Sequence, residues 1–199
     1  VKELVAQACA AHGPTHATKG NYNNHIGLPI SVLNTPADVA YAVIELGANH
    51  PGENAQLAAV VQAQVAVVTS VGSDHLEGFG SILGVARASG EVFAALASGA
   101  TAILGTFGLD ESCAAFGESA AAVREVLVDA ADGRNLIVLD RADLDGAVDA
   151  EGLRLRIDGT NLTVALLGDH NLVNVAIAWH AARAAGVPAE AVRRGLSSM

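Results

Sequence analysis

Two short apolar runs stand out along the chain, and each is followed by a residue that can bind a divalent cation. Residues 41–45 read YAVIE, and residues 65–69 read VAVVT before the chain reaches His75. Unbroken runs of Val, Ile and Ala are typical of strands buried in a parallel sheet. Because open parallel sheets bind ligands beyond the carboxyl ends of their strands, Glu45 and His75 are predicted to share a metal site if the strands are close together. Alternatively, Glu45 caps a neighbouring helix and His75 is an ordinary loop histidine.

Helical and strand-like patterns alternate along most of the chain. Apolar residues at helical spacing predict helices, and Pro29 is tolerated in the first turn of one of them. These helices are expected at 1–12, 26–33, 53–62, 81–96, 118–130, 172–185 and 189–196. Extended segments are expected at 15–20, 41–45, 65–69, 100–104 and 136–139. Such alternation implies right-handed crossovers and an α/β fold, with a mainly parallel sheet flanked by helices.

The hydrophobic period changes in the C-terminal part of the chain. Residues 152–159 read GLRLRIDG, in which apolar and charged residues alternate, and residues 162–167 read LTVALL. Alternation with a period of two indicates a strand with one buried face, and Asp158 and Gly159 form a typical turn pair. A small antiparallel hairpin is therefore predicted in addition to the parallel sheet.

Composition and charge narrow the range of functions. With 199 residues, 51% of them hydrophobic, the chain can form one substantial core or one domain with a small appendage. The net charge of −10 and the presence of only two lysines, Lys2 and Lys19, argue against a nucleic-acid surface. No apolar run approaches the roughly 18 to 20 residues that span a bilayer, so we expect a soluble protein without membrane insertion. Cys9 and Cys113 lie far apart in alanine-rich segments, which favours buried free thiols in a reducing compartment.

Both ends of the sequence fall within or directly after helical patterns. The helical spacing starts at Val1 with no preceding residue that could cap a helix, and the chain ends at Met199 soon after the last helical pattern. We therefore expect residues 1–199 to be one domain cut at both ends from a longer protein.

Four ordered motifs carry a family resemblance. The motifs are GNYNNHIGLP at 20–29, ELGANHPGE at 45–53, HLEGFG at 75–80 and GDHNLVN at 168–174. In this order they resemble the central ATP-binding domain of the Mur ligases, and the first two motifs are most similar to the MurF type. The resemblance covers most of the chain, and it implies the P-loop-type α/β fold of that domain in a bacterial cytoplasmic protein.

The resemblance implies an ATP-dependent ligase of peptidoglycan precursor synthesis. Enzymes of the MurF type add D-alanyl-D-alanine to UDP-N-acetylmuramoyl-tripeptide through an acyl phosphate, and cations neutralise the phosphate charge. ATP and Mg²⁺ are therefore the implied cofactors, and the UDP-MurNAc-peptide and D-Ala-D-Ala are the implied partners. The site residues carried over are Glu45 and His75 for the metal, His170, Asn171 and Asn174 for ATP, and Asn23 and Asn24 for the peptide substrate.

The asparagines also have purely structural explanations. Asn171 and Asn174 lie three residues apart at a predicted helix start, so their amides face one side and can contact a purine or ribose. Asn171 can equally cap that helix. The amides of Asn23 and Asn24 suit a polar ligand as well as they suit a simple turn.

The chain departs from the family pattern at several positions. It contains no glycine-rich phosphate-binding loop ending in Gly-Lys-Thr or Gly-Lys-Ser, and the residues that start at Val1 resemble those that directly follow that loop. The loop, the strand before it, and the substrate-binding N-terminal and amine-binding C-terminal domains are expected to lie outside residues 1–199.

Ser89 occupies the expected position of a carbamylated lysine, and a hydroxyl cannot supply the negative charge of a carbamate. Residues 105–107 read GTF in place of an Asn-Ala-Asp-like turn, and Asp169 stands where MurF-type sequences often have arginine.

Three functional hypotheses remain open at this point. The first is a MurF-type ligase domain that cannot turn over alone, and the four motifs favour it. The second is a divergent, non-catalytic nucleotide- or metal-binding module of the same fold, which Ser89 and residues 105–107 favour. The third is another Mur ligase or a relative of folylpolyglutamate synthase, because those enzymes share the nucleotide chemistry.

Overall fold

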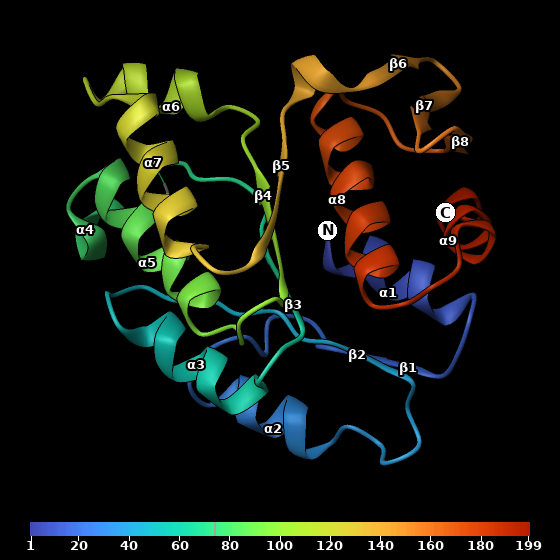
Figure 1. The fold of residues 1–199 in the computed structure, drawn as a ribbon, viewed down its shortest axis with the longest axis horizontal. Coiled ribbons are helices and arrows are strands. Elements are labelled where there is room, and N and C mark those ends of the chain that lie inside the picture. The colour runs from blue at the N-terminus through green and yellow to red at the C-terminus, as the bar shows by residue number, and fades with distance from the viewer. Residues whose placement is uncertain (74) are drawn as a thin grey trace.

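The computed structural model describes residues 1–73 and 75–199, and it contains parallel strands flanked by helices together with an antiparallel sheet (Figure 1). In chain order the elements are α1 (Lys2–Ala10), β1 (Thr15–Ala17), α2 (Gly27–Leu33), β2 (Tyr41–Val43), α3 (Glu53–Val61), β3 (Val65–Val68), α4 (Leu76–Phe79), α5 (Ile82–Ala94), β4 (Thr101–Gly105), α6 (Leu109–Ala115), α7 (Ala120–Ala130), β5 (Asn135–Leu139), the 3-10 helix η1 (Arg141–Asp143), β6 (Asp145–Asp149), β7 (Gly152–Ile157), β8 (Thr160–Val164), α8 (His170–Ala184) and α9 (Ala189–Ser197). The predicted α/β fold class is confirmed. No described helix is long and apolar enough to cross a membrane.

The parallel strands form two sheets. β1 pairs with β2, while β3, β4 and β5 form a second sheet in that order. The register places Val67 beside Ile103 and Ile103 beside Ile137, so β-branched side chains follow one another across the sheet. Because side chains alternate along a strand, Ile103 packs in the core around α8, whereas Ala102 and Leu104 pack in the core around α5 and α7.

Helices cover both faces of the three-stranded sheet. In Figure 1, α5 and α7 lie on one side of β4 and α8 lies on the other. α8 is also in contact with α1, α9 and the antiparallel sheet, and most of its side chains are buried. A helix that is apolar around its whole circumference belongs in such an interior position. This packing fixes the start of α8, where three of the predicted site residues lie.

The antiparallel part is larger than the sequence predicts. β7 and β8 form the expected hairpin with Asp158 and Gly159 in the turn, but β6 adds a third strand beside β7. The two-strand prediction is therefore wrong in strand number. β6 reads DGAVD and alternates between exposed and half-buried residues, so it has too few apolar side chains to be recognised as a strand from its pattern. Other elements also differ from the prediction. The sequence pattern does not predict the short helices α4, α6 and η1. β2 ends at Val43, before Glu45, and α8 begins two residues before its predicted start.

The two cysteines agree with the sequence-based expectation. Cys9 lies in α1 and Cys113 in α6, and both are buried free thiols. Burial raises the pKa of the Cys9 thiol to about 11 and also raises the pKa of Cys113. Because the thiolate is the reactive form, neither cysteine is suited to nucleophilic chemistry near neutral pH.

A large cavity lies between β2 and β3. Its volume is about 1310 Å³, and residues 41–46 and 64–70 line it together with parts of α1, α3, α5 and α8. Within the described residues, β2 pairs only with β1 and β3 only with β4, so one edge of each strand has no partner strand. The cavity wall includes Glu45 and Ser70, which lie just beyond the carboxyl ends of these two strands.

The N-terminus of α5 is held by a carboxylate from a distant part of the chain. Glu118 accepts hydrogen bonds from the backbone N–H groups of Ile82 (2.7 Å) and Leu83 (2.8 Å), and Ser81 Oγ accepts one from Gly84 (2.9 Å). The first N–H groups of a helix have no partner within the helix, and this end of the helix favours negative charge. Glu118 therefore fixes the start of the helix that carries Ser89.

We expect Glu118→Ala to lower the free energy of unfolding by about 1–2 kcal/mol, because two hydrogen bonds to a charged acceptor are lost. Glu118→Gln, which keeps one carbonyl acceptor, should have a smaller effect. Urea denaturation followed by circular dichroism measures both variants. Glu125→Ala on the exposed side of α7 removes the same charge and should change stability by less than about 0.5 kcal/mol. An equal effect of the two alanine variants would contradict the capping role.

Candidate functional site

Glu45 is held in a defined position just beyond β2. Its backbone N–H donates to Thr18 Oγ1 at 3.0 Å, and Thr18 is buried. Its carboxylate Oε1 accepts a hydrogen bond of 2.7 Å from Asn23 Nδ2, and Oε2 lies 3.4 Å from Lys2 Nζ. The side chain is 38% exposed, so one side of the carboxylate remains accessible from the cavity that it lines.

Lys2 is a site residue that sequence reasoning did not identify. Its ammonium donates to the carbonyl oxygen of Gly20 at 3.0 Å and lies 3.4 Å from carboxylate oxygens of Glu3 and Glu45. The Lys2 side chain is 13% exposed, which is low for a lysine. Its place in the first turn of a helix gave no signal that it would reach two loops far away in the sequence.

The loop that contains Asn23 and Asn24 packs against the loop that follows β2. Asn24 Oδ1 accepts from the N–H groups of Ile26 (3.1 Å) and Gly27 (2.9 Å), so it satisfies two backbone donors where α2 begins. The Asn23 carbonyl oxygen accepts from the Gly47 N–H at 2.8 Å. A side chain at Gly47 would place its Cβ 2.8 Å from Asn23 Cγ, so it would push the Asn23 amide out of its present position. Both asparagines therefore make hydrogen bonds within the protein.

His75 directly precedes α4 as its N-cap residue and has a left-handed backbone conformation with φ of 59°. It is not among the described residues that line the cavity beside Glu45. Its neighbour Asp74 lies outside the described residues. The structure therefore places Glu45, but not His75, on the wall of the central cavity.

The described residues contain no group of three or more His, Cys, Asp and Glu side chains that could hold a metal ion. Mg²⁺ does not need such a group, because it commonly uses one or two carboxylates together with water and substrate phosphates. The oxygen atoms of Glu45 and Gly20 that converge on the Lys2 ammonium are donors of the type that Mg²⁺ prefers. The residues around Glu45 thus fit an open cation site that is completed by other ligands.

The predicted nucleotide residues lie together in the first turns of α8. Asn174 Nδ2 donates to Asn171 Oδ1 at 2.9 Å, and Asn171 Nδ2 donates to the Leu167 carbonyl at 2.8 Å. His170 and Asn174 line the same cavity as Glu45, and the His170 ring centroid is 6.4 Å from that of Phe107. The amides of Asn171 and Asn174 are hydrogen-bonded to each other, so part of their hydrogen-bonding capacity is used within the protein, and their predicted contact with a purine or ribose stays a prediction.

Ser89 in α5 also lines this cavity. It is half-buried, whereas Arg87 on the same helix is exposed. The residue at the expected lysine position therefore faces the same space as Glu45, His170 and Asn174.

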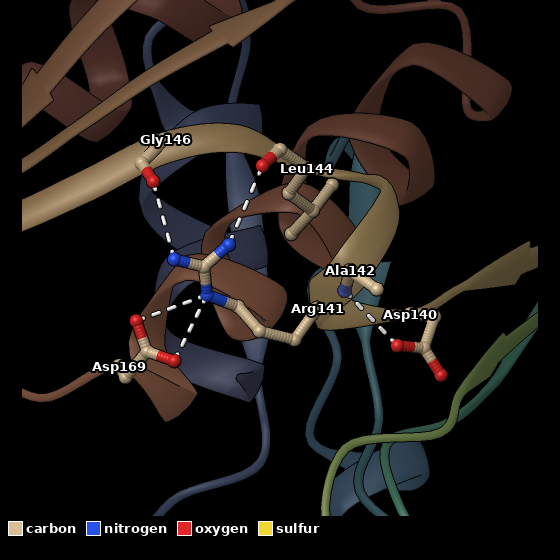
Figure 2. A network of polar contacts seen from close by, with 6 residues as sticks. All are labelled: Asp140, Arg141, Ala142, Leu144, Gly146 and Asp169. Atoms are coloured by element: carbon tan, nitrogen blue, oxygen red, sulfur yellow. Dashed lines mark hydrogen bonds and ion pairs between the residues drawn. The ribbon is translucent and has the colours of Figure 1, made fainter.

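The start of α8 is anchored by an ion pair that involves Asp169 (Figure 2). Arg141 Nε lies 2.9 Å from both carboxylate oxygens of Asp169, and the guanidinium also donates to the carbonyls of Leu144 (3.3 Å) and Gly146 (3.2 Å). The negative charge of Asp169 thus has a nearby positive partner. These contacts fix the position of His170 relative to η1 and β6.

The turn after β4 is shaped by two close contacts. A Cβ at Gly105 would lie 2.2 Å from the Thr69 carbonyl oxygen, so no side chain fits there. Thr106 Oγ1 donates to Asp140 Oδ2 at 2.6 Å, and this hydrogen bond is the main reason that the pKa of Asp140 lies below its usual value. The turn directs Phe107 into the cavity beside His170.

Comparison with known proteins identifies the family. The profile of the Mur ligase middle domain matches residues 1–182. UDP-N-acetylmuramoyl-tripeptide--D-alanyl-D-alanine ligase of Escherichia coli (strain K12) is 32% identical over the whole of this chain, which covers 44% of that protein. The crystal structure of MurF from Acinetobacter baumannii superimposes with a TM-score of 0.83 at 27% identity, over 98% of this chain and 42% of that one.

A more distant structure shows the same fold. MurF ligase from Thermotoga maritima, solved in complex with ADP, has a TM-score of 0.78 at 22% identity, over 100% of this chain and 45% of that one. The chain thus spans less than half the length of each of these relatives. The profile match and the identity to the E. coli enzyme show that the chain belongs to the Mur ligase family and corresponds to its middle domain.

Proposed function

We propose that this chain is the nucleotide-binding middle part of an ATP-dependent ligase that joins D-alanyl-D-alanine to UDP-N-acetylmuramoyl-tripeptide in the bacterial cytoplasm. One observation carries this proposal beyond the family match. Glu45, Ser89, His170 and Asn174 come from separate parts of the chain, and all line one cavity at the ends of parallel strands. The E. coli relative has the name of this activity. The peptide ligase reaction also explains why a cation-binding carboxylate and a nucleotide-binding helix are needed in the same space.

The proposed roles follow the chemistry of each side chain. Glu45 binds Mg²⁺ through its accessible carboxylate. The match of residues 75–80 to the family motif supports His75 as a second ligand, although His75 does not line the cavity in this structure. His170, Asn171 and Asn174 bind the nucleotide, and the Asn174 amide has remaining donor and acceptor capacity beyond its bond to Asn171. When bound, Mg²⁺ supplies positive charge that neutralises the phosphates during transfer to the substrate carboxylate.

Asn23 and Asn24 support the peptide-binding loop in this proposal. Asn24 holds the loop against the start of α2, and Asn23 links it to Glu45. A substrate carboxylate that binds this loop would therefore lie close to the proposed cation. Such proximity is what phosphoryl transfer between ATP and a carboxylate requires.

We further propose that the phosphate-binding loop and its preceding strand belong to the segment before Val1 in a longer protein. The cavity supports this placement, because Val1 lines it and because it separates the unpartnered edges of β2 and β3. An extended segment in this position would pair with both edges, satisfy their backbone groups and fill the part of the cavity between the two strands. The part beyond the carboxyl ends of the strands, beside Glu45, Ser70 and His170, would stay open for ligands. In the relatives, more than half of the chain lies outside the matched part, which leaves room for separate substrate-binding and amine-binding domains.

A non-catalytic nucleotide- or metal-binding module is the second candidate. Ser89 favours it, because its neutral hydroxyl faces the cavity where a carbamylated lysine is expected. Assay of ADP release by the full-length protein separates the two candidates. Release that requires both the tripeptide precursor and D-alanyl-D-alanine supports the ligase, whereas no release even after repair of Ser89 supports the binding module.

We expect Ser89→Lys to increase this ADP release by at least about tenfold in the presence of bicarbonate, because a carbamylated lysine restores a negatively charged metal ligand. Arg87→Lys is the matched control, since it introduces a lysine on the exposed side of the same helix and should leave the rate unchanged. Equal rates for the wild type and the Ser89→Lys variant would show that this position does not carry the lysine function.

A further inference from the structure

The Lys2 ammonium contacts both Glu45 and the loop that contains Gly20. Its ammonium lies among three oxygen atoms, which belong to Gly20, Glu45 and Glu3. Two of these oxygens, the Gly20 carbonyl at 3.0 Å and Glu45 Oε2 at 3.4 Å, come from the two loops that form the proposed cation site. A carbonyl and a carboxylate oxygen that converge on one positive charge form the kind of environment in which a hard metal ion also binds.

We propose that the Lys2 ammonium occupies the cation position beside Glu45, and that a divalent cation binds there only by displacing it. This inference rests on the proposed role of Glu45 in metal binding. Lys2 is then a positioning residue that holds the loop of Gly20 and the carboxylate of Glu45 together until the cation arrives. It acts through Glu45 and has no direct part in the chemistry.

The contacts of Glu45 indicate which of its two carboxylate oxygens would exchange Lys2 for a metal ion. Oε1 is held by Asn23 at 2.7 Å, and this bond does not depend on Lys2. Oε2 has Lys2 as its partner, so it is the oxygen that a metal ion would take over. Asn23 therefore keeps the carboxylate in place while its second oxygen changes partner.

The surroundings of Lys2 allow the displaced ammonium to remain paired. Glu3 Oε1 lies 3.4 Å from Lys2 Nζ on the solvent side, and the Glu3 side chain is 73% exposed. The flexible lysine stem can rotate toward Glu3 without loss of a charge partner.

Binding of Mn²⁺ to the full-length protein, in which residues precede Val1, tests this proposal directly. Free Mn²⁺ is measured by electron paramagnetic resonance at constant pH and ionic strength, for wild type and for Lys2→Met, Lys2→Arg, Lys19→Met and Glu45→Gln. Lys2→Met should bind Mn²⁺ about two- to fivefold more tightly than wild type, because the competing charge of a partly exposed ion pair is gone. Lys2→Arg keeps the charge and should bind like wild type, and Glu45→Gln should lose binding.

Lys19→Met is the matched control for net charge, because Lys19 is the other lysine of the chain and is exposed near the same loop. It should change Mn²⁺ affinity less than Lys2→Met does. A purely structural role of Lys2 predicts the opposite sign, since disorder of the Gly20 loop would weaken Mn²⁺ binding. Unchanged or weaker binding by Lys2→Met, or no binding by any form, overturns the proposal.

Thermal unfolding in EDTA provides the second measurement. Lys2→Met and Glu45→Gln should each lower the melting temperature, and the double variant should lower it by less than the sum of the two, because they share one ion pair. Additive effects would overturn the pairing. Failure of the proposed ligase function is recognised separately, by the absence of ADP release in the full-length protein, and it does not alter these binding and unfolding measurements.

Discussion

Glu45→Gln is expected to reduce ligase turnover of the full-length protein by at least about 100-fold, because a neutral amide removes the charge that, in the proposed mechanism, holds the cation beside the transferring phosphate. The substitution preserves the size of the side chain. Its amide oxygen can still accept the hydrogen bond from Asn23 Nδ2. The fold should therefore persist, and the loss should appear in the rate of ADP release at saturating ATP.

The measurement needs a control with the same change of charge at a distant site. Glu125→Gln on the exposed side of α7 provides it and should leave ADP release unchanged. Raising the Mg²⁺ concentration should restore part of the activity of the Glu45→Gln form if the carboxylate acts by binding metal. A Glu45→Gln form with more than half of the wild-type rate would contradict the proposed role of this residue.

The apolar runs predicted the parallel strands well, because their signal depends on a property of the strand itself. Residues 65–68, 101–105 and 135–139 are strands with helices packed on both faces of their sheet, so most of their residues are apolar whichever face they point to. β6 gave no comparable signal. Its side chains are exposed or half-buried, and it is a strand because β7 lies beside it.

Only part of the candidate site could be predicted from the sequence, because some of its residues follow local patterns whereas others depend on contacts between distant segments. Glu45, His170 and Asn174 were identified because they follow strand or helix patterns and match family motifs, and the structure brings them to one cavity. The contacts of Glu45 with Lys2 and Asn23 depend on the packing of α1 and the loop of Asn23 against the end of β2. No local pattern in the sequence specifies such packing. The family resemblance gave the chemistry of the site, whereas the structure gave the groups that hold Glu45 in place.

Trp179→Ala should have the largest effect on stability, a loss of about 3–5 kcal/mol in the free energy of unfolding. Trp179 is the only tryptophan of the chain, is fully buried in α8, and lies in the core that joins α8 to α1, α9 and the antiparallel sheet. Its Nε1–H donates to Asp158 Oδ2 at 2.8 Å, which ties the helix to the turn between β7 and β8. Truncation leaves a cavity that the surrounding helices cannot close without moving the start of α8 and its site residues.

Two further variants separate packing from hydrogen bonding at this position. Trp179→Phe keeps most of the buried area but loses the bond to Asp158, so it should cost about 1–2 kcal/mol, less than the alanine form. Tyr22→Ala removes an aromatic ring that is 57% exposed and should change stability by less than about 0.5 kcal/mol. Urea unfolding followed by circular dichroism is the appropriate measurement, because both Trp179 variants lack the tryptophan fluorescence signal. A loss of less than about 1.5 kcal/mol in the free energy of unfolding for Trp179→Ala would mean that α8 is not the central packing element of this domain. The ion pair between Arg141 and Asp169 would then be the contact that sets the positions of His170 and Asn174.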